Sequence, residues 1–244
     1  MTRWRATAVL AALLLLPLAG CQARAGTAAF VGPTRIADDQ LHQVADEGVR
    51  VKAISTAVSG NVGAYRRLML GRLIKRLVIA GAARKLGVSV TEGQVDQAIS
   101  GDTQRAGGRK QLDAALAAAP LQLPPSQLRP FLRDSILLDR IGTRFTAGLT
   151  FTDAELKKFY DDNGGAQSGQ SFAQLKPRVL QALQQQRGIA RAQQYVRQYL
   201  HTQKVTVNPR YGTFNAAKLF DANESPLVVG ARDDLVRDAG ATLS

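Results

Sequence analysis

The residue with the most distinctive chemistry is Cys21, the one cysteine in a chain of 244 residues. A thiolate is a nucleophile and a metal ligand, but a lone cysteine forms neither an internal disulfide nor a cysteine-based zinc site. Its position is informative, because it directly follows Leu18, Ala19 and Gly20 at the end of an apolar segment. We therefore expect a fold stabilised by packing alone, with Cys21 available for modification.

The segment before Cys21 has the three parts of an export signal. Arg3 and Arg5 form a charged start, residues 6–18 are apolar, and small residues precede the cysteine. The apolar run is shorter than the roughly 20 residues that span a bilayer. The segment resembles bacterial lipoprotein signals, and this resemblance implies removal of residues 1–20, lipidation of the Cys21 thiol, and anchoring at the extracytoplasmic face of the cell membrane.

An ordinary secretory signal is the alternative, because Ala23-Arg24-Ala25 offers a site at which soluble export would cut. In the lipid-anchored form, residues 21–27 would be a linker between the lipid and a folded domain. Two or three acyl chains hold a protein firmly where a single chain does not. Both the anchored and the shed form remain open from the sequence.

The chain is strongly basic, with 32 Lys and Arg against 19 Asp and Glu, and its formal net charge is +13. Loss of Arg3 and Arg5 with the signal would leave +11. This charge favours anionic partners such as lipid headgroups, wall polymers or acidic polypeptides. Nucleic acid is not expected as a partner, because the basic residues are spread along helices without a binding motif and the chain carries an export signal.

Catalytic signatures are missing from the sequence. It has no G-x-S-x-G elbow, no H-E-x-x-H motif and no phosphate-binding loop. The two histidines, His42 and His201, fall on separate predicted helices, and the adjacent pairs Asp161-Asp162 and Asp233-Asp234 fall in predicted loops. We therefore expect no enzyme activity, no metal and no cofactor.

The hydrophobic pattern predicts a mainly α-helical fold. A short strand at 28–31 should precede the helices and a second strand at 205–207 should follow them, and the two are expected to pair. The expected helices span 40–57, with Asp38 or Asp39 as cap, then 64–85, 91–99, 110–119, 126–142, 152–160 and 176–204, the last with Pro177 in its first turn. Residues 101–108 are expected to be a loop, and 213–244 a loosely packed tail.

Several of these segments resemble the SurA N-terminal domain of periplasmic chaperones and foldases. The residues that carry the resemblance are LGRLIKRLVIAGAARKLGVSVTEGQVDQAI at 70–99, AAFVG at 28–32 and PPSQLRPFLRDSILLDRIG at 124–142, followed by the strand VTVNPRYG at 205–212. The resemblance covers residues 28–212 and implies a helical chaperone domain that binds unfolded or newly exported polypeptides.

Such binding needs an apolar groove with adaptable side chains. The candidate groove residues are Met69, Leu73, Phe131, Ile136, Tyr160, Phe172, Tyr195 and Tyr199. Apolar residues at helical spacing also build cores, so a core position is the competing interpretation for each. Arg72, Lys75 and Arg76 are expected on a solvated face, or else on a surface that steers acidic clients or contacts lipid headgroups.

Two other functions remain open. Many relatives insert a parvulin-type prolyl isomerase domain before the last helix, but only eleven residues separate Tyr160 from Phe172 here, and the paired histidines of that domain have no counterpart. The chain would then be a relative without the catalytic domain. Alternatively, it is a basic scaffold that binds the cell wall or a partner protein through charge. The sequence indicates neither clients nor oligomeric state.

Overall fold

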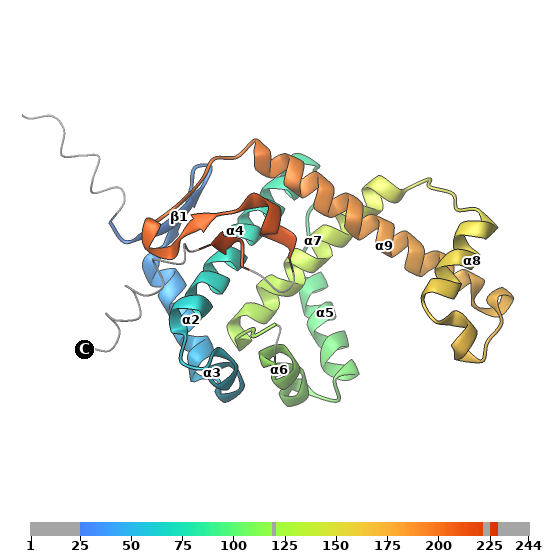
Figure 1. Ribbon diagram of the computed structural model, residues 1–244, viewed down its shortest axis with the longest axis horizontal. Coiled ribbons are helices and arrows are strands. Elements are labelled where there is room, and N and C mark those ends of the chain that lie inside the picture. The colour runs from blue at the N-terminus through green and yellow to red at the C-terminus, as the bar shows by residue number, and fades with distance from the viewer. Residues whose placement is uncertain (1–24, 119–120, 222–224, 229–244) are drawn as a thin grey trace, which may run out of the picture.

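The computed structural model describes residues 25–118, 121–221 and 225–228 (Figure 1). These residues form a mainly helical fold, so the predicted fold class is confirmed. The helices are α2 (Asp38–Arg50), α3 (Lys52–Val58), α4 (Val62–Lys85), α5 (Glu92–Arg105), α6 (Arg109–Ala117), α7 (Leu128–Thr146), α8 (Asp153–Asp162) and α9 (Phe172–His201). The candidate signal segment 1–20 and Cys21 lie outside the described residues.

A small antiparallel sheet joins the two ends of this fold. Strand β1 (Thr27–Val31) lies between β2 (Thr34–Ala37) and β3 (Val205–Val207). The predicted pairing of the first and last strands is confirmed, with Ala29 opposite Val207. Strand β2 was not predicted; it forms because Gly32, at a φ of 55°, turns the chain back on itself.

Side chains that follow β3 fasten the sheet to the start of α2. The Asn208 side-chain amide donates to the Thr27 carbonyl oxygen at 3.1 Å. The Tyr211 hydroxyl donates to Asp38 Oδ1 at 3.0 Å, and Arg210 forms an ion pair with the same carboxylate. The prediction that Asp38 or Asp39 caps this helix is therefore wrong: Ala37 is the cap residue, without a side-chain bond, and Asp38 binds the distant end of the chain.

Helix α4 is the centre of the main body. It contacts α2, α7, α9 and β1, and Leu70, Ile74, Val78 and Ile79 on it are fully buried. The side chain of Asn61 accepts a hydrogen bond from the Ala64 amide at 2.8 Å and so caps its first turn. Neighbouring elements therefore have to pack around α4, and its polar side chains have to be accommodated between them.

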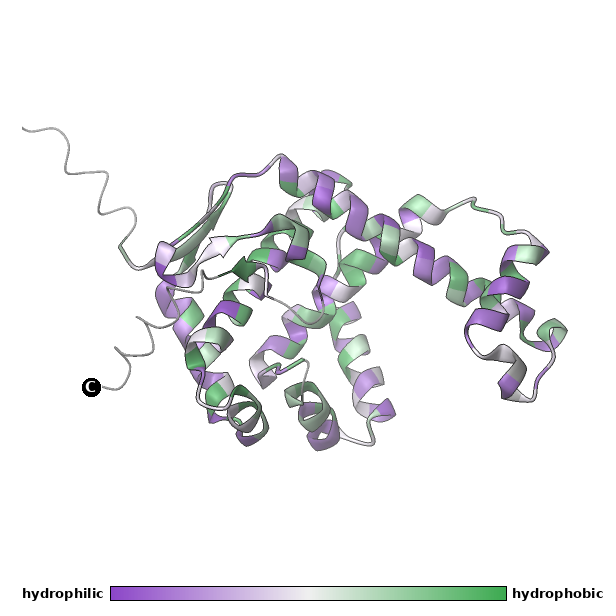
Figure 2. Cartoon of the chain, viewed as in Figure 1, coloured by the Kyte–Doolittle hydropathy of each residue, from purple (hydrophilic) through white to green (hydrophobic). Residues whose placement is uncertain are grey.

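Two smaller apolar clusters flank this core. One lies between α5, α6 and the first half of α7, around Val95 and Leu128. The other lies between α8 and the first turns of α9, around Leu156, Tyr160 and Leu183. Figure 1 shows this second cluster as a lobe at the far end of α9, away from the sheet. The stretch of α9 between body and lobe is largely hydrophilic (Figure 2).

The capping signals located several helix starts correctly. Thr91 with Gln94 and Thr152 with Glu155 form the predicted capping boxes of α5 and α8. Several boundaries differ from the prediction. The first predicted helix breaks at Val51 into α2 and α3, α5 continues to Arg105 through part of the expected loop, and α9 starts at Phe172. Pro177 therefore lies inside α9, beyond its first turn.

The expectation of a loosely packed tail after Gly212 is wrong for 213–221 and 225–228. Strands β4 (Thr213–Phe214) and β5 (Leu227–Val228) pair, and the 3₁₀ helix η4 (Ala216–Phe220) lies between them. Leu219 and Leu227 are 1% and 5% exposed and join the main core. Single buried residues on such short elements leave no periodic pattern in the sequence. The remaining residues of the expected tail lie outside the described ranges.

Helices α7 and α9 cross at two glycines. A Cβ atom built on Gly142 would lie 2.5 Å from the carbonyl oxygen of Gly188, a distance that requires the helices to move apart. A Cβ atom on Gly188 would come no closer than 3.5 Å to Gly142, which is ordinary contact. The crossing therefore requires glycine at position 142, whereas position 188 has room for a side-chain methyl group.

We expect Gly142→Ala to lower the free energy of unfolding by about 1–3 kcal/mol, because the added methyl group overpacks the crossing. Gly188→Ala is the matched control. It should leave stability unchanged or raise it by about 0.5–1 kcal/mol, since alanine is the better helix former. Urea unfolding followed by circular dichroism measures both values. Equal destabilisation by the two variants would contradict the asymmetry of the crossing.

Candidate functional site

A cavity of about 320 Å³ opens between α4, α7 and residues 219–221 and 226. We call it the α4–α7 cavity. Its apolar lining comes from Val44, Leu68, Met69, Ile79, Leu121, Leu123, Phe131, Leu138, Leu219, Phe220 and Pro226. Phe131 is 36% exposed, so part of its ring is open to solvent. The size lies at the lower end of the range for ligand sites.

Three cations of α4, namely Arg72, Lys75 and Arg76, also line this cavity. They were expected on a solvated face, but all three are partly buried because η4, Pro226 and α7 pack over that side of α4. Burial lowers the pKa of each, and it lowers the pKa of Arg72 to about 10. At neutral pH all three still carry a charge that is poorly hydrated.

The guanidinium of Arg72 is held by backbone carbonyl groups. It donates to the carbonyl oxygens of Leu121 and Gln122, the latter at 3.3 Å. Gln122 has a φ of 45°, in the left-handed region, and the Tyr65 hydroxyl donates to the same carbonyl oxygen at 3.0 Å. Burial is the main reason that the pKa of Tyr65 rises to about 12. The Arg72 charge thus has neutral acceptors among the described residues.

Arg76 and Asp134 form a half-buried ion pair between α4 and α7. Arg76 Nε lies 3.5 Å from Asp134 Oδ2, and Arg76 Nη2 donates to Gln127 Oε1 at 2.8 Å. The Nε atom lies close enough for an ion contact but makes no aligned hydrogen bond. Burial raises the pKa of Asp134 to about 6, against the opposing effect of Arg76. Burial therefore outweighs the mutual attraction for both partners.

Lys75 projects from α4 towards Phe220 of η4. Its Nζ lies 5.6 Å from the centre of that ring, and the Arg197 guanidinium lies 5.2 Å from the same centre. The aromatic ring thus has a cation from α4 and a cation from α9 within cation–π range. No ion pair of Lys75 occurs among the described residues.

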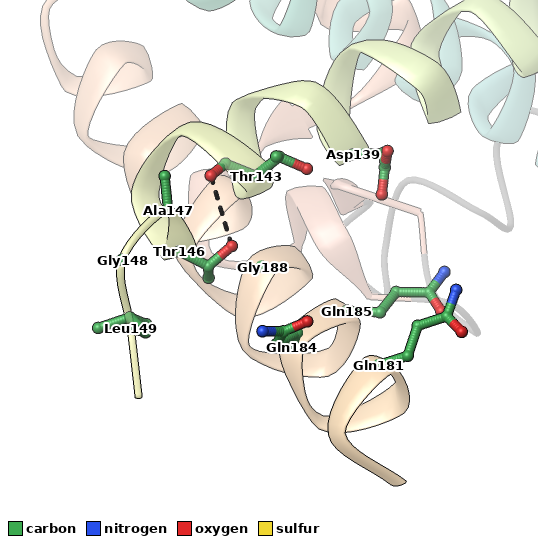
Figure 3. A pocket seen from close by; sticks show the side chains of 10 residues that line it. All are labelled: Asp139, Thr143, Thr146, Ala147, Gly148, Leu149, Gln181, Gln184, Gln185 and Gly188. Carbon is green, nitrogen blue, oxygen red and sulfur yellow. Dashed lines mark hydrogen bonds between the residues drawn. The ribbon is translucent and has the colours of Figure 1, made fainter. Parts of the chain in front are cut away.

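A second hollow, of about 410 Å³, lies where α9 leaves α7 (Figure 3). Its lining is mostly polar: Thr143 and Asp139 come from α7, and Gln181, Gln184 and Gln185 come from α9. This lining offers hydrogen-bond donors and acceptors but few apolar atoms. The hollow therefore lacks the adaptable apolar surface that promiscuous polypeptide binding requires.

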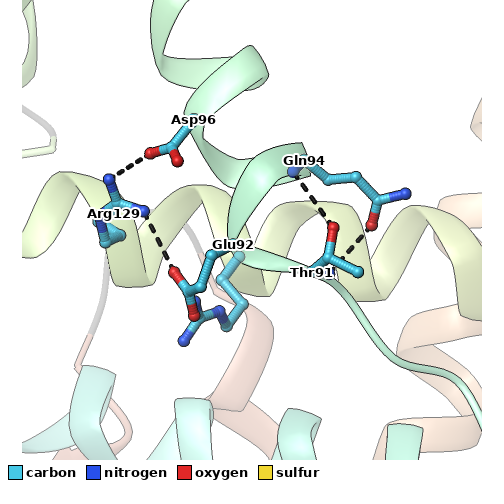
Figure 4. Close-up of polar contacts among 6 residues, drawn as sticks. Thr91, Glu92, Gln94, Asp96 and Arg129 are labelled. Atoms are coloured by element: carbon cyan, nitrogen blue, oxygen red, sulfur yellow. Dashed lines mark hydrogen bonds and ion pairs between the residues drawn. The ribbon is translucent and has the colours of Figure 1, made fainter.

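Polar contacts fix the start of α7, which carries Phe131. Arg129 forms ion pairs with Glu92 and Asp96 of α5, as Figure 4 shows, and Arg133 also reaches Glu92. These groups are substantially exposed, so each pair contributes little, and the network serves mainly to set the register of α5 against α7. The Ser126 amide, just before α7, donates to Glu47 Oε1 at 3.0 Å.

The eight predicted groove residues do not form one groove. Only Met69 and Phe131 line the α4–α7 cavity. Leu73 is 5% exposed and belongs to the main core, while Ile136 packs against the cluster between α5 and α7. Periodic spacing identified an apolar helix face correctly, but most of each face is used to pack the helices together.

The other four aromatic candidates lie elsewhere. Tyr160 and Phe172 pack edge to face within the lobe, with ring centres 5.7 Å apart. Tyr195 packs against Phe145 of α7, with ring centres 5.2 Å apart, and Tyr199 lies against Gly81 of α4. These aromatic side chains hold α9 to its neighbours.

Among the cavity residues missed from the sequence are Asp134, Leu219, Phe220 and Pro226. Asp134 lies three residues after Phe131 on α7, so helical spacing could have placed both on one side of that helix. The other three belong to the segment that was expected to be loose, and no periodic signal marks them. The sequence therefore predicts the helical wall of the cavity but not the opposite wall, which contains Leu219, Phe220 and Pro226.

No helix in the described ranges is long and apolar enough to cross a membrane. The same residues contain no cluster of three or more histidine, cysteine or acidic side chains that could hold a metal ion. No protein-family model matches this chain, and no curated protein matches it either. The function is therefore argued from the cavity and its surroundings.

The raised pKa of Asp134 predicts a pH dependence of stability. Because the folded state binds this proton more tightly than the unfolded state, whose ordinary pKa is 3.8, the contribution of Asp134 to stability falls as pH rises from about 4 to about 6. Asp134→Asn removes this contribution. We expect the stability of the wild type relative to the variant to decrease across that window, measured by urea unfolding at each pH.

Asp139→Asn is the control for this measurement, since Asp139 is an exposed carboxylate further along α7. Its difference from the wild type gives the effect of removing an exposed carboxylate from the same helix. If the wild type instead gains stability relative to Asp134→Asn as pH rises, the raised pKa of Asp134 is contradicted. Such a gain would require the contact with Arg76 to outweigh burial.

Proposed function

We propose that this protein is a membrane-anchored extracytoplasmic chaperone that binds unfolded or newly exported polypeptides in the α4–α7 cavity. The observation that carries the proposal is an open cavity with Met69 and Phe131 in its lining. The partly exposed ring of Phe131 suits contacts with many different side chains, whereas Met69 is 1% exposed and supports the cavity from the core. The proposal assigns the protein to binding rather than catalysis.

The physical basis of binding is burial of apolar surface. Each Å² removed from water contributes about 25 cal/mol, without directional requirements. A cavity of about 320 Å³ holds a short apolar segment rather than a folded domain. Binding would thus be weak and reversible, which suits a protein that must release its clients.

The proposal also rests on the resemblance to SurA N-terminal domains, which implies an opening strand, a set of helices and a closing strand. A first strand is followed by helices, and the last long helix leads into a strand that pairs with the first. Between α8 and α9 the chain has only a short connection with the 3₁₀ helix η2 (Gly165–Ser168). This connection is far too short for a parvulin domain, in keeping with a chaperone relative without isomerase activity.

The proposed location rests on the sequence around Cys21. Lipidation there would tether the body through a linker that ends at β1, which starts at Thr27. The basic surface would add attraction to anionic headgroups. The cavity would then be held near the membrane from which exported chains emerge.

We expect the mature chain to begin at Cys21 and to carry lipid. Mass spectrometry of the purified protein should show the N-terminal peptide starting at Cys21 with added acyl mass, and Cys21→Ser should incorporate no labelled fatty acid. Ser55→Ala, a change at an exposed position in the body, is the control and should be labelled as the wild type is. A mature chain that starts at Gly26 without lipid would instead indicate soluble export.

We expect Phe131→Ala to weaken binding of a fluorescent unfolded polypeptide to residues 22–244 by about fivefold or more. The reason is that truncating a large apolar contact costs roughly 1–3 kcal/mol of binding. This chain contains every described residue, so the whole folded body is tested. Binding is measured by fluorescence anisotropy across a range of salt concentrations.

Phe145→Ala is the matched control, because Phe145 is on the same helix and is similarly exposed, at 39%, but does not line the cavity. It should bind as the wild type does. Binding by an apolar cavity should persist as salt rises, whereas binding by the basic surface should fade. Loss of all binding at moderate salt would favour the charge-based scaffold and end the chaperone proposal.

A further inference from the structure

The α4–α7 cavity combines an apolar lining with an excess of positive charge. Its described lining includes three cations, from Arg72, Lys75 and Arg76, and two carboxylates, from Asp134 and Asp221. The carboxylates leave one positive charge without an anionic counterpart in that lining. A poorly hydrated charge of this kind gains more from an incoming anion than the same charge would in water.

The three cations differ in how far they are already engaged. Arg72 is held by two backbone carbonyl groups, and Arg76 is held by Asp134 and Gln127. Lys75 contacts the Phe220 ring, which is a weak partner compared with a carboxylate. Lys75 is therefore the cation best able to accept a new anionic partner without breaking an existing ion pair.

We propose that the cavity recognises client segments in which a carboxylate neighbours apolar side chains, with Lys75 binding the carboxylate. This inference rests on the proposed chaperone function and adds a preference to it. The apolar neighbours of the carboxylate would contact Phe131 and Phe220, which are only partly buried. The ammonium group of Lys75 would exchange its contact with the Phe220 ring for a charge-assisted hydrogen bond.

The dimensions and charge of the cavity favour a peptide over a lipid as occupant. Its volume of about 320 Å³ suits one or two side chains. One excess positive charge in the described lining matches one carboxylate. The cavity is also closed on one side by the chain's own segment around Phe220 and Pro226, whose proline lies against Gly71 of α4. The proline ring in this position shows that an apolar side chain of a polypeptide fits against α4.

The test compares two labelled peptides rich in Leu and Phe that differ only in one central residue, Asp in one and Asn in the other. Residues 22–244 should bind the Asp peptide about tenfold more tightly, the scale of a hydrogen bond to a charged group. Lys75→Gln should remove this preference, so that the variant binds the Asp and the Asn peptide with equal affinity. Lys75→Arg should retain most of it, because it keeps the charge.

Lys85→Gln is the matched control. Lys85 is an exposed lysine on the same helix and does not line the cavity, so its loss changes the net charge equally but should leave the preference intact. Circular dichroism and melting temperature would verify that each variant is folded. If Lys85→Gln reduces the preference as much as Lys75→Gln does, the effect belongs to overall charge and the inference is overturned.

The remaining outcomes separate this inference from the proposed function. Equal binding of the two peptides to the wild type would overturn the inference and leave the chaperone proposal intact. Binding of neither peptide, together with no binding of unfolded polypeptide, would overturn both. Lys75-dependent binding of phosphatidylglycerol vesicles or of inorganic phosphate, without discrimination between the peptides, would assign the charge to a phosphate group and overturn the carboxylate preference.

Discussion

The rest of the structure depends on how α4 places cations inside the protein. This helix is surrounded by α2, α7, α9 and the sheet, so its apolar residues build the core and Arg72, Lys75 and Arg76 cannot all reach bulk water. The surroundings compensate in different ways: carbonyl groups for Arg72, a carboxylate for Arg76 and an aromatic ring for Lys75. Several of the groups that accommodate these charges therefore also form part of the cavity wall.

This arrangement links stability to the proposed function. A fully apolar α4 would pack more favourably, since buried ion pairs are often replaceable by apolar residues at no cost. The cations instead line the cavity beside α4. The glycine crossing of α7 and α9 fixes the long helix α9, and the first turns of this helix carry the lobe. Rigid packing at one end of α9 thus supports an exposed lobe at the other.

Local signals made parts of this fold predictable from the sequence. The capping boxes at Thr91 and Thr152 depend on residues three positions apart, and the β1–β3 pairing followed from two short β-prone runs at the ends of the domain. The break at Val51 and the packing of Leu219 depend on contacts between distant segments, which no local pattern encodes. The cavity was half predictable for the same reason: α4 and α7 are periodic, and the segment that faces them is not.

The contacts that join the two ends of the chain also constrain the order in which the protein can fold. Asn208 bonds to Thr27 across 181 residues of sequence, and Tyr211 reaches Asp38 across 173. Such contacts have a high loop-closure entropy and form late. A chain threaded through a translocation channel from its amino terminus would hold β1 without its β3 partner until the last helix had emerged. On the proposed export route, a polypeptide proposed to shelter incomplete chains would itself be incomplete for most of its passage.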